Sequence, residues 1–533
     1  MTTGPFGTAP RHSPPLPTAV LVALAILYLL AGVTGHDPWK TEDAIHIAIA
    51  HGFATQGHWL TPSVAGELWP HTAPLYHWLA ALSGKLFGSL LPFHDAARLA
   101  TTACGALFLF AIAGAARSLH GDNAGRSAPL LAMGTLGLLL PMHEAQPAIA
   151  GLACAALAWW GAGQVLQGRT RGALLLGLGL GLSFPAHGLA GLLMAIAALP
   201  APILRRDWKA LALTLLIALP LAAAWPTLLS SRAPEFWSQW WLNEFAEATQ
   251  ARGLPGAAHL EQLTWAAWPI LPLSLWSAWL TRRAPGRLAL PLLGTLIGLL
   301  WYLSGSSRTL AMMPLLVPLM LTAAAGADRL RRGAASAFDW FALMTFTFAA
   351  GLVWLGASAQ ALDWPPKIAR NFDKLAPGHA VHYGIAALGF AALISLIWLL
   401  GWRLRRTSWR ASLRWAAGTT LMWSLLAMLW LSWIDHYKSY RPVAASLRAA
   451  LPAESGCIER GNFGISHRAS LDYFTGLRTV APSPIRRCEW RLGIDNAGRD
   501  APPGWVERWQ GHRPGDRRER WYLDQREASE AVH

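Results

Sequence analysis

Residues His36–Trp78 read HDPWKTEDAIHIAIAHGFATQGHWLTPSVAGELWPHTAPLYHW and follow directly after the first apolar segment of the chain. Acidic residues, histidines and tryptophans are concentrated in this stretch, whereas the sequence around it is dominated by Leu, Ala and Gly. A dense polar loop between apolar segments is where a membrane protein keeps its chemistry. We therefore expect the functional site in this loop.

The composition of the chain is typical of a polytopic membrane protein. The 533 residues are only 14% charged and have a mean hydropathy of +0.31, which is too apolar for a soluble enzyme. The net charge of +15 comes largely from short basic clusters between apolar runs. Such clusters mark cytoplasmic loops, so we predict that the chain contacts membrane lipids and does not bind nucleic acid.

Thirteen apolar segments are long enough to span a bilayer. They lie near residues 17–35, 97–118, 127–142, 147–166, 172–186, 189–204, 210–227, 263–280, 288–303, 309–326, 338–360, 382–402 and 415–434. A fourteenth candidate, Pro74–Leu91, contains His77 and Lys85. Counting it as a span would place every later basic cluster on the outer side of the membrane, whereas thirteen spans place these clusters in the cytoplasm. We therefore predict thirteen spans, with Pro74–Leu91 as an amphipathic helix at the outer interface.

This topology divides the chain into three parts. Residues 1–16 are a cytoplasmic tail, and no clear cleavage site follows, so the first span is expected to be retained. Residues 17–434 form a transmembrane helical domain with periplasmic loops at 36–96 and 228–262. Residues 435–533 form a small periplasmic α+β domain. We expect the whole protein in a bacterial inner membrane.

The C-terminal region mixes helix-like and strand-like patterns. The pattern predicts a helix at Pro442–Leu451 and strands at Val506–Gln510 and Arg520–Leu523. Cys457 and Cys488 both fall in this region, where an oxidising compartment would pair them, so we predict a disulfide between them.

Glu42 and Asp43 are adjacent carboxylates at the start of a helix-like run. One interpretation is an N-terminal cap, because acids in the first turn favour the helix dipole. The other is a catalytic site, which the histidines of the same loop favour. Glu42 and His46 are four residues apart, so both side chains can face one ligand or metal ion.

Three further polar residues lie at predicted outer turns. Glu144, in PMHEAQP, is an acid at the mouth of a span, where a charge is costly and usually functional or paired. His187, in FPAHG, occupies another outer turn. Arg308, in SGSSR, is a candidate phosphate ligand, although anchoring to a lipid headgroup is an alternative role.

The order of these motifs resembles the bacterial glycosyltransferases of the GT-C superfamily, in particular the protein O-mannosyltransferase-like and lipid A aminoarabinose transferase-like branch. The first outer loop of that family reads PDEARYAEIA…GDW..P…G….EKPPLYYW, and TEDAIHIAIA, GHWLTP, AGE and HTAPLYHW follow in the same order here. The resemblance places Glu42 and Asp43 on the acidic pair of the family and Glu144 on its second outer acid. It also implies a GT-C fold of thirteen spans.

The loop departs from the family pattern at its positive charges. Thr72 stands where the family has a lysine, His71 where it has a glutamate, and His187 replaces the lysine of a second motif. We predict that Lys40, His71, His187 and Arg308 supply the replacement charge for a donor phosphate. A divalent metal at His46 and His71 is a further candidate, and no other cofactor is expected.

The resemblance implies an inverting glycosyltransferase. It would move a sugar from a polyprenyl-phosphate-linked donor to a lipid, glycan or protein acceptor, with Asp43, Glu42 or Glu144 as the general base. Two alternatives stay open at this point. One is a polytopic transporter or flippase for a lipid-linked or polar substrate, and the other is a GT-C scaffold that has lost catalysis.

Overall fold

A computed structural model describes residues 15–249, 256–305, 308–379, 381, 383–404, 407–495 and 501–527. The predicted cytoplasmic tail lies almost entirely outside these residues. The helices before the C-terminal domain are α1 (Thr18–Leu30), α2 (Glu42–Gln56), α3 (Leu75–Phe87), α4 (Phe93–His120), α5 (Asp122–Gly134), α6 (Leu136–Leu139), α7 (Pro147–Leu166), α8 (Gly172–Ile196), α9 (Pro200–Arg205), α10 (Trp208–Arg232), α11 (Pro234–Thr249), α12 (Ala257–Ala266), α13 (Ile270–Leu280), α14 (Ala289–Ser304), α15 (Met313–Ala324), α16 (Arg332–Leu362), α17 (Pro366–Leu375), α18 (Ile385–Leu400), α19 (Arg410–Leu429) and α20 (Leu431–Lys438). Short 3-10 helices lie at η1 (Pro285–Leu288), η2 (Leu310–Met312), η3 (Ala327–Arg329) and η4 (Gly401–Arg403).

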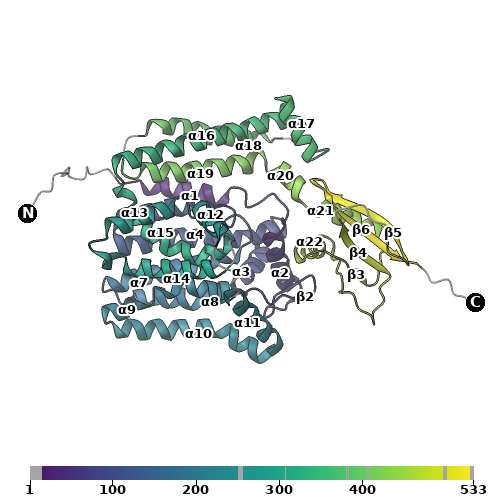
Figure 1. Cartoon of the computed structure of the whole chain (residues 1–533), viewed down its shortest axis with the longest axis horizontal. Helices are drawn as coiled ribbons and strands as arrows, with labels where there is room; N and C mark the ends of the chain where they lie inside the picture. The colour runs from purple at the N-terminus through teal and green to yellow at the C-terminus, as the bar shows by residue number, and fades with distance from the viewer. Residues whose placement is uncertain are drawn as a thin grey trace, which may run out of the picture.

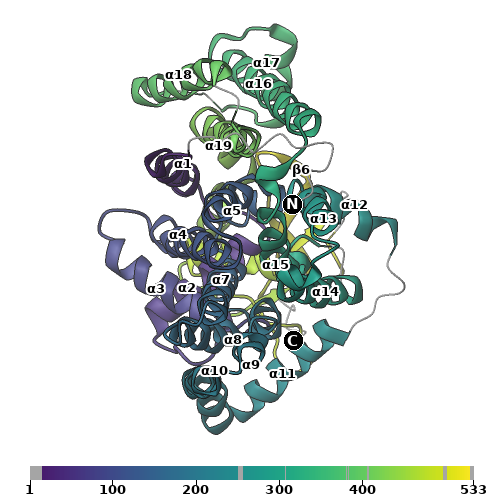
Figure 2. The same cartoon turned by 90° about the vertical axis from the view of Figure 1, so that its left-hand side faces the viewer.

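The long helices run side by side and form one bundle (Figures 1 and 2). Each of the thirteen predicted segments coincides with helical residues. By length and composition, six helices among the described residues can cross a bilayer, or seven if a pair bent by 67° after α19 counts as one span. The fold is thus that of a multi-pass membrane protein, and the count of thirteen crossings stays a prediction.

The chain reverses direction within α8, at the turn predicted from FPAHG. His187 and Gly188 have non-helical backbone angles, and Gly188 has a φ of +57°. A Cβ atom on Gly191 would come within 2.2 Å of the carbonyl oxygen of Ser183, although eight residues of straight helix would separate the two by about 12 Å. The residues before and after the turn therefore form an antiparallel pair of helices, as predicted.

Small residues allow α7 and α8 to pack closely. A Cβ atom on Gly161 would lie 2.3 Å from the backbone nitrogen of Leu176, and one on Gly179 would lie 2.4 Å from that of Ala158. Backbone contact of this kind is how helices associate in a membrane, where apolar burial alone does not drive them together. This packing fixes the position of the turn at His187.

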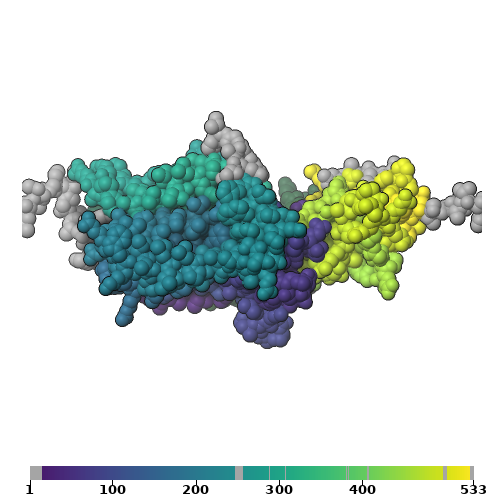
Figure 3. Space-filling view, turned by 90° about the horizontal axis from the view of Figure 1, so that it is seen from below, coloured from purple at the N-terminus to yellow at the C-terminus, as the bar shows by residue number. Residues whose placement is uncertain are grey.

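The polar loop of residues 36–96 folds over one end of the bundle. It contains α2, a short hairpin of β1 (Ser63–Val64) and β2 (Glu67–Leu68), and α3. Helix α3 has 13 residues and is about 20 Å long, too short to cross a hydrocarbon core of about 30 Å. Figures 1 and 3 show this region between the bundle and the C-terminal domain.

The C-terminal domain is a small α+β unit. It contains α21 (Arg441–Ala450), β3 (Ile458–Arg460), α22 (Ile465–Thr475), β4 (Trp490–Asp495), β5 (Trp505–Arg513) and β6 (Asp516–Arg526). The sheet has the order β3-β4-β6-β5, with β3 parallel to β4 and the other pairs antiparallel. Cys457 and Cys488, the pair expected from the sequence, form a disulfide that joins the start of β3 to the segment before β4.

Candidate active site

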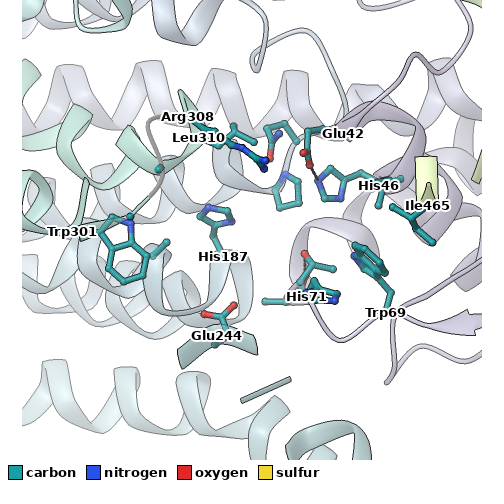
Figure 4. Close-up of a pocket in the computed structure, with 18 residues that line it drawn as sticks. Glu42, His46, Trp69, His71, His187, Glu244, Trp301, Arg308, Leu310 and Ile465 are labelled. Atoms are coloured by element: carbon teal, nitrogen blue, oxygen red, sulfur yellow. Dashed lines mark hydrogen bonds and ion pairs between the residues drawn. The ribbon is translucent and has the colours of Figure 1, made fainter. Parts of the chain in front are cut away.

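A cavity of about 400 Å3 lies where the helix bundle meets the polar loop and the C-terminal domain. Its walls come from α2, the residues before α3, the start of α7, the turn in α8, α11, the connection between α14 and α15, and α22. The ionisable side chains that line it are Glu42, His46, His71, His187, Glu244 and Arg308 (Figure 4). Segments far apart in the sequence therefore meet in one charged cavity.

Glu42 presents a carboxylate to this cavity. It is the first residue of α2, where a negative charge is favourable, and its side chain is 40% exposed. Its Oε2 lies 3.4 Å from Nε2 of His46, in the i, i+4 geometry expected from the sequence. A hydrogen bond from His46, opposed by burial and helped by the positive charge of Arg308, lowers the pKa of Glu42. The cavity thus contains an ionised acid near the cationic side chain of Arg308.

Asp43 lies behind Glu42 and does not line the cavity. It is 1% exposed, and Arg98 donates to both of its oxygens, from Nε to Oδ1 at 3.1 Å and from Nη2 to Oδ2 at 2.7 Å. The backbone nitrogen of Ala145 also donates to Oδ1, at 2.8 Å. Burial alone would raise the pKa of Asp43, but the charge and hydrogen bonds of Arg98 lower it overall. Asp43 is therefore an ionised carboxylate whose oxygens are already engaged.

Arg98 fixes the start of the polar loop against the bundle. It is fully buried in α4, and its Nη1 donates to Asp95 and to the carbonyl oxygen of His36 at 2.9 and 3.0 Å. Its Nη2 donates to the carbonyl oxygen of Asp37 at 3.1 Å. Paired, hydrogen-bonded charges are the form in which a buried guanidinium is tolerated. This cluster sets where α2 begins, and hence where Glu42 lies.

Arg308 and His187 supply hydrogen-bond donors to the cavity, and Arg308 supplies its positive charge. Arg308 extends from the connection between α14 and α15 toward Glu42, and His187 projects from the turn in α8 (Figure 4). The positive charge of Arg308 acts on Glu42, whereas burial lowers the pKa of His187 to about 4, so its ring is a neutral hydrogen-bond donor at neutral pH. Hydrogen-bond donors of this type beside a carboxylate suit an anionic group that is held next to a proton acceptor.

The chain is similar in sequence to known glycosyltransferases. The family described as dolichyl-phosphate-mannose-protein mannosyltransferase matches residues 71–229. The undecaprenyl phosphate-alpha-4-amino-4-deoxy-L-arabinose arabinosyl transferase of Pseudomonas aeruginosa is 27% identical over 434 residues, which cover 77% of this chain and 74% of that protein. An enzyme of the same name from Sodalis glossinidius is 28% identical over 65% of each chain.

Among solved structures, the chain is similar to ArnT from Cupriavidus metallidurans bound to undecaprenyl phosphate. The TM-score is 0.69 at 16% identity, over 96% of this chain and 98% of that one. This likeness shows a shared GT-C fold along the whole chain. The chain is a glycosyltransferase with this fold. Its sequence is similar to those of the arabinosyl transferases named above, and it is a multi-pass protein of the inner membrane. The sequence similarity thus favours an enzyme over the transporter considered above.

Besides Asp43, two predicted site residues of the glycosyltransferase lie away from the cavity. Nζ of Lys40 lies 3.3 Å from Oε2 of Glu519 and 3.2 Å from Nε2 of His467, so it contacts the C-terminal domain. Glu144 lies in the turn before α7, beside Asp43. Burial, and then the negative charge of Asp43, raises the pKa of Glu144.

His71 does line the cavity of the glycosyltransferase, and its ring lies against that of Trp69, with 4.4 Å between the ring centroids. The predicted metal-binding pair, His46 and His71, is thus brought to one cavity. Within the described part of the chain, however, no group of three or more His, Cys, Asp or Glu side chains is arranged to hold a metal ion.

Two functional features of the glycosyltransferase were missed from sequence alone. Glu244 of α11 lines the cavity, and its Oε2 accepts a hydrogen bond of 2.9 Å from the backbone nitrogen of Leu189. The sequence identifies Glu244 only as an acid in a predicted outer loop. Arg98 had a stronger signal, because a cation inside an apolar segment needs a partner. Which carboxylate would pair with it could not be read from the sequence.

Proposed function

We propose that this glycosyltransferase moves a sugar from a polyprenyl-phosphate-linked donor to a hydroxyl group of a lipid, glycan or protein acceptor. The observation that carries the proposal is one cavity in which the carboxylate of Glu42 faces the side chains of Arg308 and His187. An acid beside a cation and a neutral hydrogen-bond donor suits the reaction, because the acid takes a proton while the other two stabilise a leaving phosphate. The relatives named above act on an undecaprenyl-phosphate-linked aminoarabinose, so this is the first donor to test.

Transfer is proposed to proceed in one displacement. The acceptor hydroxyl gives its proton to Glu42 while its oxygen forms a bond to the anomeric carbon. The bond between that carbon and the phosphate oxygen breaks, and the electron pair stays with the phosphate. Arg308 and His187 donate hydrogen bonds to the phosphate as its charge develops. Attack opposite the leaving group inverts the anomeric centre without a covalent glycosyl-enzyme.

We place this reaction at the periplasmic face of the inner membrane. The N-terminal helix α1 begins at one end of the bundle, and the C-terminal domain lies at the other (Figure 1), which supports an odd number of crossings such as thirteen. With the basic loops in the cytoplasm, the cavity and the C-terminal domain are periplasmic. A donor with its prenyl chain in the bilayer can then present its phosphate at the cavity.

The test is Glu42→Gln, assayed for sugar transfer from a polyprenyl-phosphate donor in nanodiscs. Removing a general base should lower kcat by roughly a hundredfold or more, because the amide accepts no proton from the hydroxyl. Glu261→Gln is the matched control, since Glu261 is an exposed acid of α12 that does not line the cavity. It should turn over like the parent.

Equal turnover by Glu42→Gln and the parent would exclude Glu42 as the base, and Glu144 would be tested next. A parent that is inactive with every lipid-linked donor would favour a scaffold that has lost catalysis. In the same assay, Arg308→Gln should raise the KM for the donor more than it lowers kcat, if Arg308 binds the phosphate in the ground state.

A further inference from the structure

A second pocket, of about 310 Å3, lies between the C-terminal domain and the helices next to it. Its walls come from β5, the start of β6, α21, α20 and the connection between α17 and α18. None of the described residues that line it also lines the active-site cavity. In both Figures 1 and 2, α17 lies on the opposite side of the bundle from α11, which lines that cavity. The chemistry described above therefore does not use this pocket.

Trp509 forms an aromatic wall of the pocket. Its side chain is half-buried, and its Nε1 donates a hydrogen bond of 3.0 Å to Oγ of Ser446. A Cβ atom on Gly511 would lie 2.3 Å from Cζ2 of Trp509, so the ring lies against a residue that has no side chain. Pro442 and Pro514, whose rings are rigid, also line the pocket. The indole is thus held in place, and it presents an apolar surface on which the C–H face of a sugar ring can pack.

The polar groups of the pocket favour an anionic ligand. Arg517, near the start of β6, contributes a guanidinium group, whose planar set of N–H donors matches the oxygens of a phosphate or carboxylate. No acidic side chain is among the described residues that line the pocket. His436 also lines it, and its Nε2 is buried without a hydrogen-bond partner in the described part of the chain. Buried polar atoms of native proteins are rarely left unsatisfied, so this nitrogen points to a ligand that supplies its partner.

We propose that this pocket binds an anionic saccharide, such as a sugar phosphate. The sugar ring packs on Trp509, the phosphate binds Arg517, and a hydroxyl group pairs with Nε2 of His436. The volume of the pocket is at the lower end of the range for ligand sites, about 300–1,000 Å3, which suits a small saccharide. Because this site is separate from the cavity at Glu42, the inference does not depend on the proposed function.

Saturation-transfer difference NMR with the full-length protein in phosphatidylcholine nanodiscs tests the site. With glucose 6-phosphate as the probe, saturation should reach the ring protons that pack on Trp509, and Trp509→Leu should remove this transfer. Arg517→Gln should weaken binding of the probe roughly tenfold, because a charge-assisted hydrogen bond is lost. Arg517 is exposed, so this variant keeps the fold. Arg518→Gln is the matched control and should bind like the parent, since Arg518 is a neighbouring exposed arginine that does not line the pocket.

Equal binding of glucose 6-phosphate by the parent and by Arg517→Gln would overturn the inference, because contacts elsewhere would then account for the signal. Inorganic phosphate that displaces the probe as well as glucose 6-phosphate itself does would also overturn it, since the site would then recognise only the anion. Anionic saccharides occur free and as the heads of lipids. Adding polyprenyl-phosphate-linked glucose to the nanodiscs separates these sources. Loss of the Arg517-dependent signal would assign a lipid-linked saccharide, and its persistence would assign a free one.

Discussion

Two adjacent acids of one helix have separate tasks in this structure. Successive residues of an α-helix point about 100° apart, so Glu42 and Asp43 cannot face the same group. Glu42 faces the cavity, whereas Asp43 faces Arg98 inside the protein. On sequence alone, an N-terminal cap and a catalytic base are alternative roles for the pair. The two acids therefore need separate assignments, one for each residue.

The different surroundings of Glu42 and Asp43 predict different phenotypes for the variants Glu42→Gln and Asp43→Asn. Asp43→Asn removes the charge that neutralises Arg98, and breaking a buried ion pair costs about 3–5 kcal/mol. We expect the lower end of that range, because Arg98 retains Asp95 as a partner. The apparent melting temperature in detergent should fall clearly for Asp43→Asn and remain near the parental value for Glu42→Gln. Equal melting temperatures for the two variants would show that the pair with Arg98 contributes little.

At the scale of elements, the turn within α8 places two groups of the site at once. It projects His187 into the cavity, and it brings the backbone nitrogen of Leu189 to the carboxylate of Glu244. Gly188 makes this possible. Its φ of +57° is a conformation that L residues rarely adopt, and a Cβ atom there would lie 2.4 Å from Oε1 of Glu244.

Gly188→Ala should therefore displace Glu244 as well as strain the turn. We expect a loss of about 1 kcal/mol or more in stability and a several-fold lower kcat/KM for the lipid-linked donor. Gly351→Ala is the matched control in α16, since a Cβ atom at Gly351 meets nothing within 4 Å. It should be neutral or stabilise the helix by up to about 1 kcal/mol. Similar kinetics and melting temperatures for both variants would show that the turn at Gly188 does not contribute to the site.

Local pattern explains what could be predicted, and long-range contact explains what could not. Apolar runs and a Pro-Ala-His-Gly turn were enough to predict the helices and the reversal at His187, because these features depend on neighbouring residues. The spacing of Glu42 and His46 likewise predicted their shared face. The partner of Arg98 and the contact between His46 and His77 depend on how α2, α3 and α4 approach one another. No spacing in the sequence encodes that approach.

For the whole molecule, the two ends of the bundle carry different chemistry. The cavity and the C-terminal domain lie at one end, and the chain enters α1 at the other (Figure 1). We predict that a reporter that is active only in the cytoplasm stays dark when it is fused after residue 533, whereas the same reporter before residue 1 is bright. A bright C-terminal fusion would exclude thirteen crossings.

The C-terminal domain is also joined to the polar loop by ion pairs. Lys40 lies 3.3 Å from Glu519 of β6, and the side chain of Arg441 forms an ion pair with Asp37. Figure 3 shows the two regions in contact. Burial would raise the pKa of Glu519, but hydrogen bonds from His467 and Tyr440 and nearby positive charge outweigh it and lower the pKa to about 2.

A carboxylate with a lowered pKa stabilises the fold above its ordinary pKa, and that contribution disappears as the pH falls toward the folded value. We therefore expect the C-terminal domain itself to lose stability progressively between about pH 4.5 and pH 2, because the groups that lower this pKa belong to the same domain. Glu519→Gln should lose roughly 3 kcal/mol at neutral pH and show a smaller further loss on acidification. Limited proteolysis from pH 7 to pH 3, with a protease active across that range, measures the loss by cleavage within the domain. Glu454→Gln, in which an exposed acid after α21 is changed, is the control and should follow the parent. If Glu519→Gln resists proteolysis as the parent does at every pH, other contacts stabilise the domain.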